Sequence, residues 1–199
     1  MKHQIILFLG AILLLQLTGC SSITHQISDQ PSIKNPTPAE LENWKVTGKL
    51  AVRTPQKAQS ISLIWHQQNT NYKISLNGPM GFGSAIINGN QLQTIIQNGS
   101  KTLIGTPDQL GAKLLGIPLS TDAMSWWIKG LASPKQPKAS NIMYQQNGLI
   151  SSLQQSGWQL QFSSYQTEGI YKVPKKITGR RGELSFKLVI NKWNLFDQL

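Results

Sequence analysis

Acidic residues, histidine and cysteine are all scarce in this 199-residue sequence. It has eight Asp and Glu against 19 Lys and Arg, three His and one Cys, which gives a formal net charge of +11 at pH 7. A single cysteine excludes a disulfide framework within the chain. The surplus of positive charge favours partners that carry negative charge.

Groups that could form a catalytic or metal site are scarce in the part of the chain expected to fold. His3 and His25 lie in the N-terminal segment, which leaves His66 on a strand face predicted to be exposed. The carboxylates have no paired spacing, and no zinc, phosphate-loop or nucleophile-elbow motif is present. Gly81-Phe82-Gly83 begins like a dinucleotide fingerprint, but it lacks the third glycine and a predicted strand follows it. We therefore predict that the protein is not an enzyme, with no catalytic residue, no metal and no cofactor.

The N-terminus has the features of an export signal. The apolar run 5–15 is too short to span a bilayer and has the length of a signal-peptide core. It leads into Leu17-Thr18-Gly19-Cys20, which is typical of a lipobox, where cleavage precedes the cysteine and its thiol is lipidated. The alternative is an ordinary secreted protein with an unpaired thiol, which is unusual in an oxidising compartment. We expect a signal peptide at residues 1–19 and a lipid anchor on Cys20.

The rest of the chain divides into a tether and one domain. Residues 20–36 are polar without an apolar period and read as a flexible tether, and residues 37–199 have the length of a single domain. Seven basic residues lie between Lys172 and Lys192. We expect no nucleic acid as partner of an exported protein; anionic lipid head groups or an acidic protein fit better. A solvated face that keeps the protein soluble is the other interpretation.

Most of the domain shows the period of two that half-buried antiparallel strands produce. Asn88-Gly89-Asn90 and Asn98-Gly99 interrupt the pattern and are hairpin signals. The inward positions of the expected strands are Val46, Gly48, Leu50 and Val52; Ile61, Leu63 and Trp65; Tyr72, Ile74 and Leu76; Trp158, Leu160 and Phe162; and Leu184, Phe186, Leu188 and Ile190.

Helical signals are confined to short segments. A capping box with proline at the first helical position begins a short helix at Thr37 and another helix at Thr106, and a third helix runs from near Ser120 to Gly130. The sequence therefore predicts a mainly β fold, a long antiparallel sheet with a short helical insertion. A sheet of eight or more strands curls or closes.

The inward face of this sheet carries large apolar side chains, and two interpretations of them remain open. A curled sheet with only two short helices to cover it has little material to fill its inside. The aromatic residues either form a packed core that the helices plug or line a cavity for an apolar ligand. The candidate lining residues are Trp65, Tyr72, Trp127, Trp158, Phe162 and Phe186.

One loop places apolar side chains where polar ones are usual. Residues 77–85 read Asn-Gly-Pro-Met-Gly-Phe-Gly-Ser-Ala, a glycine-rich turn that contains Met80 and Phe82. These two residues either fix the turn to the core or are presented to something outside the protein.

Several segments together resemble the LolB family of outer-membrane lipoprotein receptors. They cover essentially the whole mature domain and owe their specificity to their order and spacing. The segments are residues 44–52, Ser62 to Trp65 with Gln67, Gly78 to Gly81, Trp127 to Gly130, Gln155 to Trp158, Val173-Pro174 with Ile177, and Leu188 to Trp193. Leu131 to Pro134 departs from the Leu-Pro pair that often follows in the family, which leaves the loop after the third helix unassigned by the resemblance.

The resemblance implies a half-open β-barrel with a helical lid over an apolar cavity. It further implies a monomer, anchored to the outer membrane and facing the periplasm, that accepts lipoproteins by their acyl chains from a LolA-like periplasmic carrier. Release into the inner leaflet of the outer membrane involves a protruding loop, which matches Gly78, Pro79, Met80, Gly81 and Phe82, with Met80 at its tip. The alternative function is a structural or assembly lipoprotein that grips a protein partner by a sheet edge or its basic face.

Overall fold

The computed structural model describes residues 36–79, 83–135 and 137–196. They belong to one compact unit, residues 36–199. Within these residues, no helix is both long enough and apolar enough to cross a membrane.

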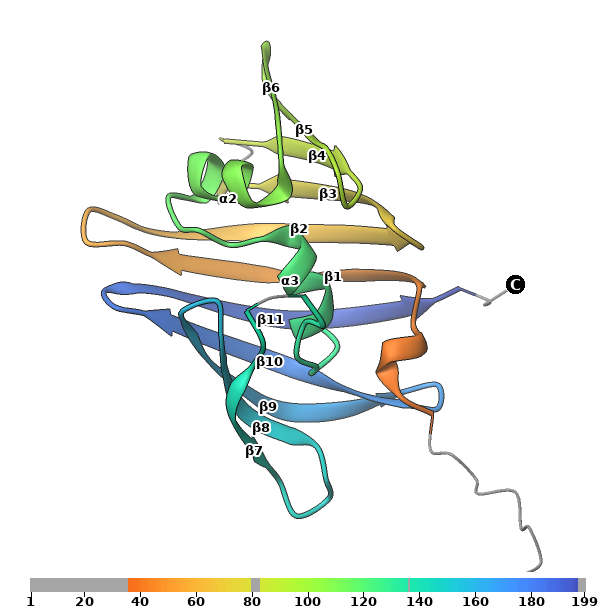
Figure 1. Ribbon diagram of the computed structural model, residues 1–199. Helices are drawn as coiled ribbons and strands as arrows, with labels where there is room; N and C mark the ends of the chain where they lie inside the picture. Colours follow the sequence, from red (N-terminus) through yellow and green to blue (C-terminus); the bar gives the residue numbers. More distant parts are fainter. Residues whose placement is uncertain (1–35, 80–82, 136, 197–199) are drawn as a thin grey trace, which may run out of the picture. The chain divides into compact units, whose positions relative to one another are not determined.

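A single antiparallel sheet of eleven strands forms the unit, in the order β6-β5-β4-β3-β2-β1-β11-β10-β9-β8-β7 (Figure 1). Both chain halves are meanders, and they join where β1 pairs with β11. The strands are β1 (Asn43–Arg53), β2 (Ala58–Gln68), β3 (Asn71–Asn77), β4 (Ala85–Gly89), β5 (Thr94–Asn98), β6 (Lys101–Gly105), β7 (Ser140–Tyr144), β8 (Ile150–Gln155), β9 (Trp158–Glu168), β10 (Tyr171–Arg181) and β11 (Leu184–Leu195).

The alternation read from the sequence predicts the buried face of β1, β2, β3, β9 and β11. In β1, Val46, Leu50 and Val52 are buried while Lys49 and Arg53 are exposed. The two hairpins expected from the Asn-Gly signals join β4 to β5 and β5 to β6, as predicted.

Three strands were not predicted individually, and each lacks a clean period. All five residues of the edge strand β7 are exposed. β8 carries only two buried residues, Leu153 and Gln155. In β10, two buried residues, Val173 and Pro174, are followed by two exposed lysines, so the alternation breaks. The break coincides with Ser164 on β9, whose φ of 55° interrupts the pairing between β9 and β10.

The short helices begin where the capping signals predict. Thr37 caps a single 3-10 turn, η1 (Pro38–Glu40), by accepting a hydrogen bond from the Ala39 backbone N–H. The helix α2 (Pro107–Leu115) starts after Thr106 with the predicted capping box and ends at Gly116, which is left-handed with φ 74°. The helix α3 (Thr121–Trp127) follows after a short connection.

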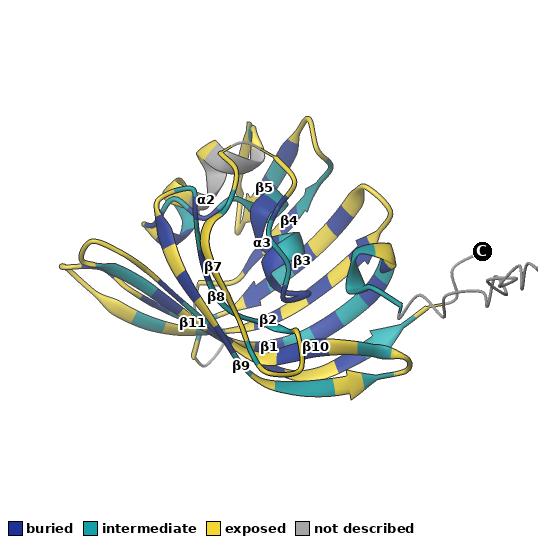
Figure 2. Ribbon diagram, turned by 60° about the horizontal axis from the view of Figure 1, so that its bottom comes forward, coloured by how far each residue is buried: buried dark blue, intermediate teal, exposed yellow. Residues whose placement is uncertain are grey.

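Both helices lie against the curled, buried face of the sheet, and α3 sits in its trough (Figure 2). α3 buries Ala123, Met124 and Trp127, and Ile128 directly after it is fully buried. The α2 helix contacts β5, β6 and α3. One continuous hydrophobic core fills the space between sheet and helices.

The sheet does not close. β6 and β7 are its two edges, so the fold is an incomplete barrel, as predicted. Both edge strands expose apolar side chains, among them Ile104 on β6 and Met143 and Tyr144 on β7. The open geometry leaves α2 and α3 as the described elements that cover the inner face.

Candidate functional site

The six aromatic residues predicted to line a cavity all lie in the interior between the sheet and the helices. Their exposed fractions run from 1 % for Trp127 and Trp158 to 9 % for Tyr72. They come from β2 (Trp65), β3 (Tyr72), α3 (Trp127), β9 (Trp158 and Phe162) and β11 (Phe186). The structure therefore brings residues more than 100 positions apart in the chain to one apolar interior.

One aromatic cluster joins the helix α3 to the sheet. The rings of Trp127 and Phe186 are stacked, 6.5 Å between centroids and 5° between planes. Trp158 meets Phe186 edge-on at 5.2 Å. Pairs with these geometries add stability beyond the area that they bury. Phe186 is thus where the sheet packs against α3.

A missing side chain makes room for Phe186. Gly179 lies directly opposite Phe186 in the pairing of β10 with β11. A Cβ atom on Gly179 would lie 2.1 Å from Cε1 of the Phe186 ring. The ring can lie over the neighbouring strand, and so reach Trp127, only because residue 179 is glycine.

A second aromatic cluster lies at the other end of the interior. Trp44 is 5.4 Å from Trp65 and 5.3 Å from Trp193, and Trp65 is 6.3 Å from Tyr72, all between ring centroids. The Trp193 Nε1–H is buried and has no hydrogen-bond partner within the described part of the protein. Unpaired buried donors are uncommon and costly, so this end of the interior contains an unsatisfied polar group.

Gln155 fastens the segment that contains α3 to β8. Its Oε1 accepts hydrogen bonds from the Trp127 Nε1–H and from the Ser133 backbone N–H, both at 2.9 Å. Its Nε2 donates to the carbonyl oxygens of Ser133, at 2.8 Å, and Pro137, at 3.1 Å. Gln155 is 3 % exposed. One amide therefore holds both the helix and the loop after it.

Two further polar contacts fix the connection before α3. The Trp158 Nε1–H donates to the Pro118 carbonyl oxygen at 3.2 Å. The Tyr72 hydroxyl accepts from the Thr121 hydroxyl at 3.0 Å and shares a short hydrogen bond with the Thr94 hydroxyl. The helix is thus held at its start by Tyr72 and Trp158 and at its end by Gln155.

A buried lysine follows the helix. The Lys129 Nζ donates to the Leu41 carbonyl oxygen at 3.2 Å and lies 4.3 Å from the centroid of the Trp126 ring. Burial lowers the pKa of Lys129 to about 8, and the negative charge of Glu42 opposes part of that shift. The lysine connects the segment directly after α3 to the segment that enters β1.

A cavity of about 190 Å³ opens at this end of the interior, beside the second aromatic cluster. Its wall contains Trp44 and Tyr72 from the interior and Trp126, Lys129 and Asp122 from the helical segment, among others. A cavity of about 820 Å³ lies elsewhere, across the central strands, and outward-facing polar side chains make up most of its wall.

All seven basic residues between Lys172 and Lys192 are exposed.

Other predicted site residues lie outside the described residues. They include Cys20 and the loop residues Met80, Gly81 and Phe82; only Gly78 and Pro79 of that loop are described. His66 is exposed on β2, as predicted. Among the described residues, no group of three or more His, Cys, Asp or Glu could hold a metal ion.

Sequence reasoning did not assign roles to Gln155, Lys129, Trp44 or Trp193 in the site. A signal for Gln155 exists in the chain, because it occupies the inward phase of β8 two residues after buried Leu153. Gln67 stands in the same relation to Trp65 and accepts the Trp65 Nε1–H at 2.9 Å. A Gln at a strand position where the alternation predicts an apolar, buried side chain indicates that its amide forms hydrogen bonds inside the protein.

Comparison with known proteins places the chain in a family. Residues 42–193 match the family model described as "Outer membrane lipoprotein LolB". The outer-membrane lipoprotein LolB of Pseudomonas fluorescens is 32 % identical over 77 % of this chain and 75 % of its own length. That of Cellvibrio japonicus is 30 % identical over 97 % of this chain and 98 % of its own.

One solved structure agrees in fold. A LolA superfamily protein from Nitrosomonas europaea superposes with a TM-score of 0.54 over 80 % of this chain and 89 % of its own, at 9 % sequence identity. An open antiparallel sheet is thus common to both proteins. Together with the sequence relatives, the match over residues 42–193 shows that the chain belongs to the LolB family, outer-membrane lipoproteins that serve lipoprotein localisation and are not enzymes.

Proposed function

We propose that the protein accepts lipoproteins from a LolA-like periplasmic carrier by taking their acyl chains into the apolar interior, and then inserts them into the inner leaflet of the outer membrane. The observation that carries the proposal is the interior itself: a face of large apolar side chains, on a sheet with two free edges, covered by the short helices α2 and α3. Acyl chains bind to such surfaces through the hydrophobic effect.

Acyl chains enter when the segment containing α3 moves. In the closed form the rings of Trp127 and Phe186 occupy the interior and face each other. Moving α3 breaks the few polar contacts of Gln155, Tyr72 and Lys129 and leaves the sheet ladder intact. The rings of the six predicted lining residues, which are packed in the protein interior before this movement, then contact acyl chains.

The transfer needs no nucleotide or metal. A buried acyl methylene contributes about 0.8 kcal/mol wherever it is buried, so moving a chain from one apolar cavity to another nearly cancels. Small differences in affinity then set the direction. The protein acts as a monomer, held to the membrane by lipid on Cys20, and the loop with Met80 at its tip enters the acyl region when cargo is released.

The test is transfer with purified components. Carrier loaded with an acylated cargo is mixed with the protein in buffer that contains chelator and no nucleotide, and cargo is followed into the protein and then into vesicles. Binding of a fluorescent fatty acid to the protein alone is measured in parallel. Saturable fatty-acid binding and transfer are expected; a strict requirement for ATP, or failure to bind the fatty acid, contradicts the proposal.

One observation favours the second candidate, a lipoprotein that grips a protein partner by a sheet edge. The edge strand β7 exposes all five residues, including Ile142, Met143 and Tyr144. Unpaired edges of this kind readily accept another strand. Under the receptor proposal, Met143→Lys should leave fatty-acid binding unchanged. Under the alternative, it should abolish binding of the protein partner at the edge strand β7.

A further inference from the structure

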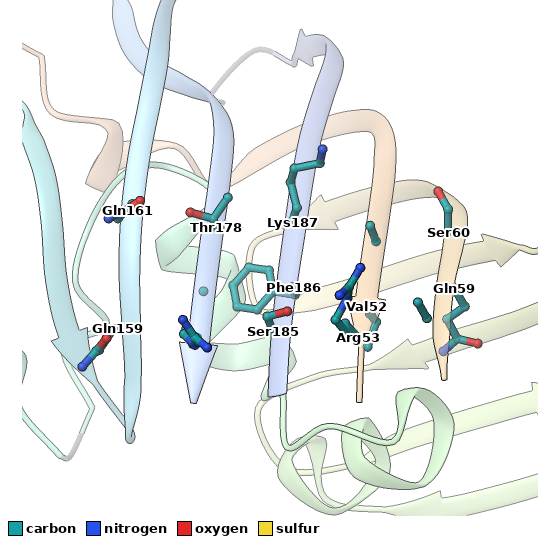
Figure 3. Close-up of a pocket in the computed structure, with 14 residues that line it drawn as sticks. Val52, Arg53, Gln59, Ser60, Gln159, Gln161, Thr178, Ser185, Phe186 and Lys187 are labelled. Atoms are coloured by element: carbon teal, nitrogen blue, oxygen red, sulfur yellow. The ribbon is translucent and has the colours of Figure 1, made fainter. Parts of the chain in front are cut away.

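The cavity of about 820 Å³ has a regular wall on the outer face of the sheet. Two rows of five residues, each row running straight across β9, β10, β11, β1 and β2, supply its outward-facing side chains. The first row is Gln159, Arg180, Ser185, Arg53 and Ala58, and the second is Gln161, Thr178, Lys187, Ala51 and Ser60. Figure 3 shows the neighbouring strands with these side chains.

Three cations and several neutral polar groups line the cavity, and none of its 14 lining residues is acidic. Arg53 and Arg180 are both opposite Ser185, two strands apart, and Lys187 is two residues further along the strand between them. Strands are about 4.8 Å apart, so the two guanidinium-bearing positions are separated by about 10 Å across the sheet.

The positive charge continues beyond the cavity. In the next outward row Lys176 and Lys49 are both opposite Val189. Lys49, Arg53, Lys176, Arg180 and Lys187, here called the basic face, thus form four corners and a centre, and all five are exposed. Within the described part of the protein, none of these five cations forms an ion pair with a carboxylate, so carboxylates do not neutralise them.

The composition of this face fits lipid head groups better than a protein. Cores of protein interfaces are rich in aromatic residues, Met and Arg, and poor in Lys, Ser and Ala. The two outward rows of the cavity wall contain two Arg but no aromatic residue and no Met, and five of their ten residues are Lys, Ser or Ala. Arginine pairs bind phosphate through charge-assisted hydrogen bonds. The absence of a carboxylate among the lining residues disfavours head groups that carry an ammonium. A phosphate with neutral hydroxyl groups suits both the cations and the Gln, Ser and Thr side chains.

The position of the face on the sheet agrees with a membrane contact. β3 ends at Asn77, which pairs with Ser62 of β2, and Ser62 in turn pairs with Lys49. The chain therefore leaves the sheet for residues 78–84 on the same half that carries the basic face. Under the proposed function, that loop enters the bilayer.

We infer that the basic face and its cavity bind anionic phospholipid head groups of the phosphatidylglycerol type and so dock this side of the sheet on the membrane during cargo release. The inference rests on the proposed function for its purpose, because docking orients a protein that delivers acyl chains. It concerns a surface on the opposite side of the sheet from the apolar interior.

The test uses the fragment 36–199, which holds the whole sheet, both helices and the entire described core and has no lipid anchor to mask weak binding. Sedimentation with vesicles of phosphatidylcholine alone and of phosphatidylcholine with phosphatidylglycerol measures the lipid preference. The variant Arg53→Gln/Arg180→Gln/Lys187→Gln removes the cavity's three cations. The matched control is Lys73→Gln/Lys101→Gln/Lys113→Gln, which removes the same charge at exposed positions outside the face.

Binding is expected on the phosphatidylglycerol vesicles and to weaken with salt. The cavity variant should bind them about tenfold more weakly or worse, because each basic residue at an anionic surface contributes severalfold, and the control should lose much less. Equal losses in both variants, or equal binding to both vesicle types, overturns the inference. Loss of carrier binding with unchanged vesicle binding also overturns it and assigns the face to an acidic protein. Fatty-acid binding by both variants stays at the wild-type level; its loss would count against the proposed function instead.

Discussion

The indole N–H of Trp127 and the side-chain oxygen of Gln155 are joined by a buried hydrogen bond of 2.9 Å that links α3 to β8. The same amide group binds the backbone of Ser133 and Pro137. Among the side chains that hold α3 and the loop after it, Gln155 therefore makes the most hydrogen bonds.

Removing that amide should loosen the lid. Gln155→Ala leaves the Trp127 and Ser133 N–H groups without their partner, and each buried unsatisfied group costs about 1–3 kcal/mol. We expect a lower melting temperature and faster uptake of a fluorescent fatty acid, measured by stopped-flow. The exposed Gln97→Ala is the control and should change neither. A destabilised Gln155→Ala protein with wild-type uptake kinetics would show that the amide supports the fold without gating entry.

Truncating the predicted lining residues should affect ligand-induced stabilisation. Trp158→Ala and Phe162→Ala each remove a fully buried ring and should cost about 3–5 kcal/mol in stability. A ligand that binds the native protein stabilises it by RT ln(1 + L/Kd), where L is the free ligand concentration, so a ligand that binds more weakly raises the melting temperature less. We expect a smaller fatty-acid-induced rise in both variants than in the wild type, measured by calorimetry. If the fatty acid raises the melting temperature of both variants as much as that of the wild type, the two rings contribute to packing alone.

Gly179 should be intolerant of any side chain while Phe186 is present. In Gly179→Ala the new Cβ would overlap the Phe186 ring, so the ring must leave its stacked position on Trp127. Overpacking of this kind costs about 1–3 kcal/mol, read from denaturant unfolding. The double variant Gly179→Ala/Phe186→Ala should lose less than the sum of the two single losses. Simple additivity would mean that the ring moves without cost.

The stability contributed by Lys129 should depend on pH. Its folded pKa, about 8, lies below the ordinary lysine value of 10.5, so the unfolded chain binds the proton more tightly. Stability therefore rises as pH increases from about 8 to 10, by on the order of 2 kcal/mol. Subtracting the profile of Lys129→Met isolates this effect from other groups. A difference profile that is flat across this window would show that the lysine is charged and solvated in the folded protein.

Met80→Glu should separate acceptance of cargo from its release. A charge at the loop tip resists entering the acyl region of a bilayer, whereas an exposed substitution usually changes stability by less than about 0.5 kcal/mol. We expect a variant that melts like the wild type, takes cargo from the carrier and fails to insert it into vesicles. Met80→Leu is the control and should insert normally. Unfolding by Met80→Glu would instead return the residue to a role in the core.

The alternation of apolar and polar residues was sufficient to predict the strands that have one exposed and one buried face. Val46 to Val52 on β1 and Trp158 to Phe162 on β9 are examples, because burial on one face imposes a period of two on the residues. The same reasoning missed β7, since an edge strand exposed along its length has no such period. It also missed β10, where the pairing with β9 is interrupted near Pro174 and Ser164.

The site was predictable only in its residue types. Six aromatic residues at inward positions can be read from the chain, and all six are buried. The grouping of five of them into two aromatic clusters, with Phe162 in neither, depends on which strands are neighbours, which is a long-range property. The stacking of Phe186 on Trp127 further depends on Gly179, a residue of another strand. The two rows of the outer cavity likewise exist only once the register of five strands is fixed.

The two free edges of the sheet bear on how much the interior can hold. In a closed barrel the circumference is fixed by the strand number and the shear, so the lumen cannot widen without breaking a ladder of hydrogen bonds. Here β6 and β7 share no ladder. The two halves of the sheet can therefore hinge apart about the pairing of β1 with β11, with side-chain contacts under the helices as the main resistance. Under the proposed function, such hinging would let the interior take cargo with different numbers and lengths of acyl chains.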